Sequence, residues 1–285
     1  MKKKLAVLVD GSGLIFRAYF ALQKQQLNSR DGQPIGAIVG FCTMLISILR
    51  KHLADFFAVV LDSGGKTFRS RLFPSYKSNR KQLPDDLRAQ FPFMADACQV
   101  LGVPLVKKPE YEADDLIATY ASLLSSRGYV VRIISSDKDF MQLITGDVHI
   151  FDPLKSKTIS ADEVLEKYSV YPSQMVSFQA LTGDTCDNIP GVDGIGPVMA
   201  AKLINKYASL DGIYENIGEV QPERIKNKLL EQKELAELSF KLARLDREVD
   251  VDDNFENFRP LYGHHIKADP IHLANEILNK RNSCD

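Results

Sequence analysis

LAVLVD (residues 5–10) is a short apolar run that ends in an acid, and it gives the clearest indication of the fold class. Five consecutive apolar residues are typical of a strand that is buried on both faces, as the strands of parallel sheets are. The same pattern returns in FFAVVLD (56–62) and VRIISSDKD (131–139), and a shorter strand is predicted over 103–106. Helical periodicity separates these strands and predicts helices over 36–50, 85–101 and 112–127. The alternation predicts an α/β protein with a mostly parallel sheet and helices on both faces.

The second half of the chain has a different pattern. From about Asp184 onward no strand is predicted, and helices are expected over 198–207, 222–231 and 233–246. We therefore expect two parts, an α/β core over residues 1–183 and a helical part over 184–285.

Composition excludes several classes of protein. The 285 residues carry a net charge of −1, with 45% apolar and 26% charged residues, as in an ordinary globular protein. Four scattered cysteines, without a CxxC pair, argue against zinc and disulfides and fit a reducing cytosol. The uncharged segment 32–49 is short for a membrane span, so we expect it to form a buried helix. The first apolar run is too short for a signal peptide.

Acids follow the predicted strands. Ligands of an open parallel sheet gather at the carboxyl ends of its strands, so acids at several such ends indicate one shared site. The helix start YEADD (111–115) is expected at the same rim, and TGDTCDN (182–188) adds a further pair. The candidate metal ligands are Asp10, Asp62, Glu112, Asp114, Asp115, Asp137, Asp139, Asp184 and Asp187.

Nine carboxylates need counter-charge, because like charges raise one another's pKa and destabilise the fold. Lys138 is the exceptional cation within these motifs. Oxygen ligands without nearby His or Cys favour Mg²⁺ or Mn²⁺, and their number suggests two metal positions, as in phosphodiester hydrolysis. For the acids of residues 112–115 a simpler explanation also stands, since acids in a first helical turn suit the helix dipole.

Two further segments suggest a polyanionic partner. KTFRSRLFPSYKSNRK (66–81) interleaves six basic residues with aromatic ones, although basic runs are usually solvated surface. IPGVDGIGPVMAAKLINKY (189–207) forms a predicted glycine hairpin before a helix that starts at Pro197. A helix N-terminus of this kind binds phosphate without reading sequence, and Lys202 adds charge; a plain glycine-rich loop is the alternative.

These motifs together resemble one family, the 5′ nucleases related to the N-terminal domain of bacterial DNA polymerase I and to flap endonucleases. The matching stretches occur in the family's order over roughly residues 5–250. They are LVDGSGLIFRAYFAL, FRSRLFPSYKSNR, YEADD, SDKDFMQL and LTGDTCDNIPGVDGIGPVMAAKL. The resemblance implies a PIN-like α/β core, a helical arch at about residues 64–84, and a C-terminal helix–hairpin–helix module.

The resemblance also assigns roles to residues. Asp10, Asp62, Glu112, Asp114 and Asp115 would hold the metal nearest the scissile phosphate, and the remaining four acids a more distant position. Two or three Mg²⁺ ions are implied, with Mn²⁺ as a substitute and K⁺ at the hairpin. Lys77 and Asp115 would be catalytic, with Lys77 stabilising charge on the transferring phosphate. The DNA-binding residues would be Arg17, Arg69, Tyr76, Lys77, Arg80, Gly191, Gly194, Gly196 and Lys202.

The resulting hypothesis is a structure-selective, sequence-independent 5′-3′ exonuclease and 5′-flap endonuclease of primer removal and DNA repair. Its partners would be DNA with 5′ flaps, nicks or 5′ ends, RNA primers annealed to DNA, and a fused or separate DNA polymerase. We expect a cytoplasmic, nucleoid-associated monomer that does not contact a membrane. Two alternatives stay open, a non-catalytic structure-selective DNA-binding protein and a PIN-type ribonuclease. One departure from the family pattern is Cys186, where serine is usual.

Overall fold

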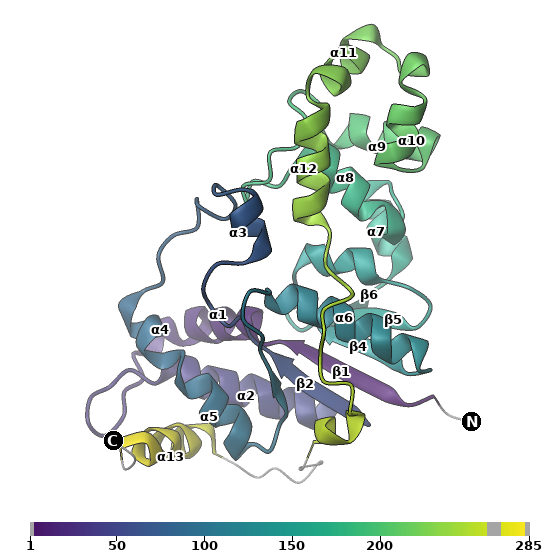
Figure 1. Ribbon diagram of the computed structural model, residues 1–285. Coiled ribbons are helices and arrows are strands. Elements are labelled where there is room, and N and C mark those ends of the chain that lie inside the picture. Colours follow the sequence, from purple (N-terminus) through teal and green to yellow (C-terminus); the bar gives the residue numbers. More distant parts are fainter. Residues whose placement is uncertain (1–2, 261–268, 283–285) are drawn as a thin grey trace. The chain divides into compact units, whose positions relative to one another are not determined.

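The computed structural model describes residues 3–260 and 269–282, so Cys284 lies outside the described residues. Contacts divide the chain into two compact units, which are described separately (Figure 1). The sheet unit comprises residues 1–63, 82–136 and 247–285, and the hairpin unit comprises residues 64–81 and 137–246. The functional boundary expected at residues 183 and 184 rests on a different criterion and stays a prediction.

The sheet unit is built on four parallel strands. They are β1 (Leu5–Asp10), β2 (Phe56–Val60), β3 (Leu105–Val106) and β4 (Val130–Ile134), in the order β3-β2-β1-β4. The register pairs Asp10 with Val60 and Val9 with Ile134, so the strands end close to the same edge. Every residue of β2 is buried, which explains its continuous apolar sequence.

Helices cover both faces of this sheet (Figure 1). α6 (Ala113–Ser126) packs against β1, β2 and β4. The other layer contains α1 (Gly11–Leu22), α2 (Gly36–Lys51), α5 (Phe93–Val100) and α13 (Pro270–Asn282). The uncharged segment therefore forms the buried helix α2, as expected, and no described helix is long and apolar enough to cross a membrane.

One predicted helix is wrong in its extent. The single helix expected over residues 85–101 is two helices, α4 (Asp85–Gln90) and α5, separated by Phe91 and Pro92. Proline cannot donate the hydrogen bond that would continue the helix, so the chain ends one helix and starts another there.

The hairpin unit is mostly helical. An antiparallel pair, β5 (Val148–Asp152) and β6 (Lys157–Ile159), precedes α7 (Ala161–Tyr168) and α8 (Met175–Thr182). The helices that follow are α9 (Pro197–Tyr207), α10 (Leu210–Glu215), α11 (Glu223–Glu231) and α12 (Lys233–Ala243). Of the region expected to form an arch, residues 64–81 belong to this unit, and they contain only one short helix, α3 (Phe68–Leu72), followed by turns.

Candidate metal centre and nucleic-acid interface

Asp10 stands at the end of β1 and is held by two hydrogen bonds. Its Oδ1 accepts from the N–H of Gly13 at 2.8 Å, so Asp10 caps α1. Its Oδ2 accepts from the hydroxyl of Ser135 at 2.7 Å, just beyond the neighbouring strand β4. With 8% of its surface exposed, this carboxylate is fixed at the carboxyl edge of the sheet.

Asp62 stands two residues beyond the end of β2, at the same edge. Its Oδ1 accepts from the N–H of Ala113 at 2.9 Å, the first residue of α6. Its own N–H donates to Ser12 Oγ at 3.1 Å, which ties the end of β2 to the start of α1. The edge of the sheet and the N-terminus of α6 are thus joined through a predicted metal ligand.

The crowded acids of YEADD form a reciprocal cap at the start of α6. The side chain of Glu112 accepts from the N–H of Asp115, and the side chain of Asp115 accepts from the N–H of Glu112 at 3.4 Å. Asp115 is fully buried, Glu112 is nearly so, and Asp114 is half-buried beside them. The helix-terminus explanation therefore describes part of the geometry, and it gathers Asp62, Glu112 and Asp115 around one helix N-terminus.

Arg17 also belongs to the sheet unit. It lies on α1, the helix that Asp10 caps, and its Nη2 donates to Ser136 Oγ. It is half-buried. Ser136 lies next to Ser135, which donates to Asp10, so Arg17 lies near the acidic edge of the sheet, and its contact with a phosphate stays a prediction.

The hairpin unit carries the other four acids. Asp137 accepts from the N–H of Asp139 at 2.9 Å, and Asp139 accepts from the Gln179 amide at 2.6 Å. Burial is the largest cause that raises the pKa of Asp139 to about 7. The negative charge of Asp137 raises it further, while the hydrogen bond from Gln179 opposes the shift. Buried carboxylates that lie close together raise one another's pKa in this way.

Asp184 and Asp187 are buried and paired with basic residues. Lys138 Nζ lies 2.8 Å from Asp184 Oδ2, and the N–H of Cys186 donates to Asp184 Oδ1 at 2.9 Å. This contact of Cys186 comes from the main chain, so it does not depend on the side chain at this position. The thiol of Cys186 is exposed.

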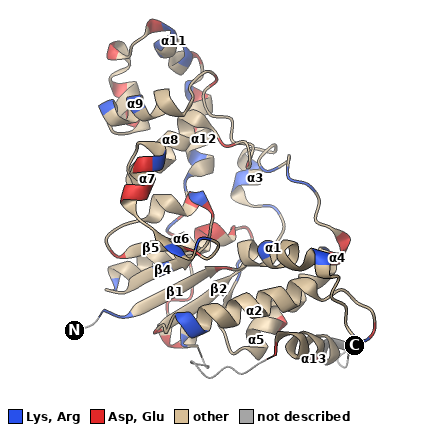
Figure 2. Cartoon of the chain, turned by 180° about the vertical axis from the view of Figure 1, so that it is seen from behind, with Lys and Arg blue, Asp and Glu red and all other residues tan. Residues whose placement is uncertain are grey.

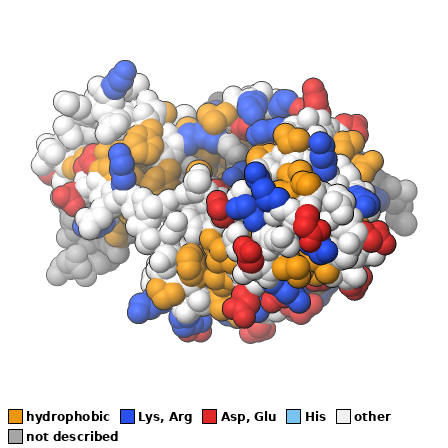
Figure 3. All heavy atoms as spheres, turned by 90° about the horizontal axis from the view of Figure 1, so that it is seen from above, with side chains coloured by type: hydrophobic (Ala, Val, Ile, Leu, Met, Phe, Trp, Pro, Cys, Tyr) orange, Lys and Arg blue, Asp and Glu red, His pale blue; other side chains and the backbone are white. Residues whose placement is uncertain are grey.

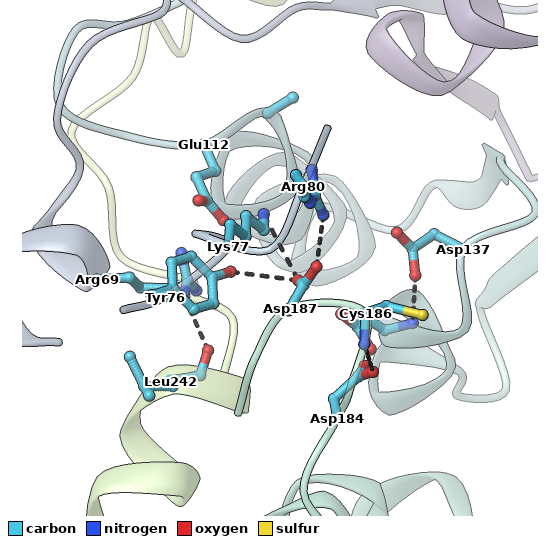
Figure 4. A network of polar contacts seen from close by, with 12 residues as sticks. Arg69, Tyr76, Lys77, Arg80, Glu112, Asp137, Asp184, Cys186, Asp187 and Leu242 are labelled. Carbon is cyan, nitrogen blue, oxygen red and sulfur yellow. Dashed lines mark hydrogen bonds and ion pairs between the residues drawn. The ribbon is translucent and has the colours of Figure 1, made fainter. Parts of the chain in front are cut away.

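Asp187 collects three side chains from the basic stretch, as Figure 4 shows. Arg80 Nη2 lies 2.5 Å from Oδ1, Lys77 Nζ lies 3.6 Å from Oδ2, and the Tyr76 hydroxyl donates to Oδ2 at 3.4 Å. Figure 2 marks the Lys and Arg residues of α3 and of the chain after it in blue. Lys77 and Arg80, the expected phosphate contacts, thus lie against a predicted metal ligand.

Two expected DNA contacts are buried in this arrangement. Arg69 is 1% exposed, and its guanidinium donates to the carbonyls of Leu242 at 2.9 Å and Arg244 at 2.8 Å. Tyr76 packs in a cluster with Ile189 and Leu242. Both side chains are engaged in contacts within the hairpin unit, and their expected contacts with DNA stay predictions.

The hairpin begins at a narrow neck. Gly183 and Gly191 both have positive φ, at 68° and 69°, and a Cβ on Gly191 would lie 2.3 Å from the nitrogen of Gly183. Only glycine fits at this approach. Main-chain hydrogen bonds between Asp184 and Ile189, at 2.9 and 2.8 Å, close the same loop.

The other end of the hairpin leads into α9. Gly196 precedes the helix, Pro197 is its first residue, and Gly194 has a positive φ of 79°. Gly194, Gly196 and Lys202 are exposed, whereas Gly191 is buried. The end of the hairpin and the start of α9 are therefore accessible, and their contact with a phosphate stays a prediction.

No group of three or more His, Cys, Asp or Glu among the residues of the described ranges is already arranged to hold a metal ion. The donors nevertheless fit a hard divalent cation, because all nine are carboxylates, most are buried, and they are held by N–H groups, lysine and arginine in its place. Sequence reasoning missed Ser135 and Gln179. Ser135 follows a strand at the acidic edge and could have been found; Gln179 lies on α8 and carries no sequence signal.

Comparisons with known proteins show which family the chain resembles. The family described as 5′-3′ exonuclease, N-terminal resolvase-like domain, matches residues 5–169, and the family described as 5′-3′ exonuclease, C-terminal SAM fold, matches residues 170–262. DNA polymerase I of Rhizobium leguminosarum is 42% identical over 256 residues, which cover 86% of this chain and 25% of the relative. A 5′-3′ exonuclease of Aquifex aeolicus is 36% identical and covers 90% of this chain and 86% of the relative.

Solved structures share the fold. T5 5′-exonuclease with bound divalent metal ions (zinc) has a TM-score of 0.70 at 24% identity and covers 97% of this chain and 99% of its own. The catalytic core of Rad2 in complex with DNA substrate has a TM-score of 0.55 at 19% identity, covering 98% and 92%. At these identities the likeness concerns the fold.

The fold is that of a PIN-like α/β domain with a C-terminal helical module, as the sequence predicts. The chain belongs to the 5′-3′ exonuclease family, a family of metal-dependent nucleases. It spans about a quarter of the length of its DNA polymerase I relatives and most of the length of the Aquifex exonuclease.

Proposed function

We propose that this chain hydrolyses DNA phosphodiesters as a structure-selective 5′-3′ exonuclease and 5′-flap endonuclease, without reading sequence. The observation that carries the proposal is the set of carboxylates at the carboxyl edge of the parallel sheet. Asp10 lies at the end of β1, where it caps α1, and Asp62, Glu112 and Asp115 form hydrogen bonds at the N-terminus of α6. A protein that only bound a polyanion would gain nothing from such acids.

Divalent metal ions are the cofactors that these acids suit. In the sheet unit, Asp10, Asp62, Glu112, Asp114 and Asp115 would hold ions nearest the scissile phosphate. In the hairpin unit, Asp137, Asp139, Asp184 and Asp187 would hold a further ion. Bound Mg²⁺, or Mn²⁺ in its place, would supply an activated water and neutralise charge on the leaving 3′ oxygen. We propose two or three such ions, and a K⁺ ion at the hairpin.

The chain's own residues would bind and orient the substrate. The exposed end of the hairpin, with Lys202 on α9, would hold a duplex by its phosphates. Lys77 and Arg80 would exchange Asp187 for phosphate oxygens of the 5′ strand, because both kinds of oxygen accept the same charge-assisted hydrogen bonds. Lys77 would then stabilise charge on the transferring phosphate. Arg17 would add a phosphate contact at the acidic edge.

The distribution of charged side chains favours binding of DNA at particular sites over binding to one large basic surface. Figure 3 shows blue Lys and Arg side chains interspersed with red Asp and Glu, in keeping with a net charge of −1. Attraction for DNA therefore depends on particular places such as the hairpin, and it should weaken strongly with salt.

The proposed biological setting follows from this chemistry. Substrates would be 5′ flaps, nicks and 5′ ends, and RNA primers annealed to DNA, as they arise in primer removal and repair. A DNA polymerase, fused or separate, would supply these ends. We propose a monomer in the bacterial cytoplasm, at the nucleoid, and a functional boundary near residue 183 between the nuclease core and the duplex-binding part.

The first experiment is cleavage of a 5′-labelled flap duplex by the purified chain, in Mg²⁺ and in chelator. Mg²⁺-dependent cutting near the junction is the expected result. Tight binding without cutting, in Mg²⁺ and in Mn²⁺, would instead establish a non-catalytic DNA-binding protein. Cutting confined to RNA would establish a PIN-type ribonuclease.

A further inference from the structure

The glycine hairpin forms hydrogen bonds with three side chains from the α11–α12 region. Lys228 lies on α11, Ser239 lies on α12, and Gln232 lies between these two helices. Ser239 Oγ accepts from the N–H of Gly191 at 3.0 Å, and Gln232 Oε1 accepts from the N–H of Asp193 at 2.8 Å. Lys228 Nζ donates to the carbonyl oxygen of Asp193 at 3.0 Å and lies 3.0 Å from its Oδ2. The Lys228 ammonium group thus contacts both the main-chain carbonyl and the carboxylate of Asp193.

The carboxylate of Asp193 is in an unfavourable place for a surface that meets phosphate. Its side chain is 87% exposed, and it immediately precedes Gly194 at the exposed end of the hairpin. A single negative charge there repels a phosphate at a few ångströms by about 1 kcal/mol in water, which is about fivefold in affinity. A counter-charge on this residue therefore removes a repulsion that would weaken binding of DNA by about that factor.

Lys228 is close enough to supply that counter-charge. Its side chain is 25% exposed, less than the carboxylate that it meets. A Cβ placed on Gly194 would lie 2.8 Å from Lys228 Nζ, so the ammonium group lies directly on the hairpin. The residue after Asp193 has no side chain that could push the lysine aside.

We propose that Lys228 is a positioning residue for duplex DNA, which neutralises Asp193 and fixes its carbonyl so that the hairpin can approach a backbone phosphate. The proposal rests on the function proposed above, in which the hairpin binds duplex DNA. Lys228 acts through Asp193. A lysine that touched the phosphate itself would give the same loss on removal, so the test must separate these two modes.

A double-mutant cycle separates them. Duplex affinity is measured by fluorescence anisotropy in chelator for the wild type, Lys228→Met, Asp193→Asn and the double variant. Lys228→Met is expected to bind about fivefold more weakly, while Asp193→Asn binds at least as tightly as the wild type. The double variant is expected within about twofold of Asp193→Asn, because no carboxylate is left to neutralise.

Each other outcome overturns something definite. An equal loss from Lys228→Met in both Asp193 backgrounds would show a direct phosphate contact and overturn this inference alone. Unchanged binding by Lys228→Met would overturn it too. A wild type without duplex affinity would overturn the proposed function and the inference together.

Controls exclude a merely structural effect. Lys226 lies on the same helix and pairs with Glu223 at 3.4 Å, so Lys226→Met is expected to leave affinity unchanged. Lys228→Arg should restore most of the loss. On a nicked duplex with Mg²⁺, Lys228→Met should raise KM about fivefold at unchanged kcat, because the loss is one of uniform binding. Equal melting temperatures of the variants confirm that the fold is intact.

Discussion

Lys138 Nζ lies 2.8 Å from Asp184 Oδ2, so a lysine that stands between two acids in the sequence neutralises a carboxylate of the other acidic pair. Both residues belong to the hairpin unit. If Asp184 binds a divalent cation, as proposed, this ammonium group would compete with the cation for the carboxylate.

Replacing this lysine should therefore tighten metal binding. Lys138→Met removes a competitor for Asp184 and one unit of repulsion, which is worth about 1 kcal/mol near the surface, or about fivefold in affinity. Calorimetric titration with Mn²⁺ measures it. Lys155→Met is the matched control, since Lys155 pairs 3.7 Å away with Asp152, outside the acid set. A weaker affinity for Mn²⁺ in Lys138→Met would contradict the competition.

Asp115→Asn should abolish cleavage and spare DNA binding. The carboxylate is fully buried and caps α6, and asparagine keeps its shape while removing the charge that a metal ion needs. We expect kcat on the flap duplex to fall at least about 100-fold. Asp55→Asn is the control, because Asp55 accepts from Leu5 at the opposite edge of the sheet. Full activity of Asp115→Asn would refute the site assignment.

Arg69→Met should destabilise the protein more than it weakens DNA binding. The guanidinium satisfies two buried carbonyls, and its loss is expected to cost about 3 kcal/mol of unfolding free energy. Arg71 is exposed on the same short helix, so Arg71→Met should cost under about 0.5 kcal/mol. Urea titration compares the two. An unchanged stability with lost DNA affinity would restore the phosphate role that the resemblance gives to Arg69.

His52 should weaken the fold in acid. Its ring is buried with Arg132 Nη1 2.9 Å from Nδ1, and desolvation first, then the charges of Arg132 and Lys51, lower its pKa to about 4. The unfolded chain binds this proton near pH 6.5 and the folded chain does not, so stability is full above pH 6.5 and falls toward pH 4.

Comparison with His52→Gln measures this contribution. Relative to the variant, the wild type should lose about 2 kcal/mol of unfolding free energy between pH 6.5 and 4.5. Urea titrations at each pH give the two curves. Parallel curves would mean that His52 takes up its proton equally in both states.

Strands with a largely apolar sequence could be predicted, and strands with a mixed sequence could not. β1 and β2 were predicted within a residue because their apolar runs are continuous and end at acids. β5, with His149 and the neighbouring β6, has alternating and partly exposed residues, so neither strand was expected. The break at Pro92 was missed because a proline within a helical pattern can also be a first-turn residue.

The sequence could identify candidate site residues by their type, but not their hydrogen-bond partners or their burial. Acids that follow predicted strands can be recognised as candidate ligands from the sequence. Their hydrogen-bond partners Ser135 and Gln179 are brought next to them only by the tertiary structure. Basic stretches with aromatic residues look the same whether the aromatics stack on bases or pack inside the protein. The burial of Tyr76 and Arg69 could therefore not be foreseen from the pattern of the stretch.

The close approach of Gly183 and Gly191 closes the loop that carries Asp184 and Asp187 through its own main-chain atoms. Lysine and arginine side chains from outside the loop then hold its two carboxylates. A side chain at either glycine would therefore open the loop and move both acids away from these partners. The same loop could be transplanted into another scaffold only together with both glycines.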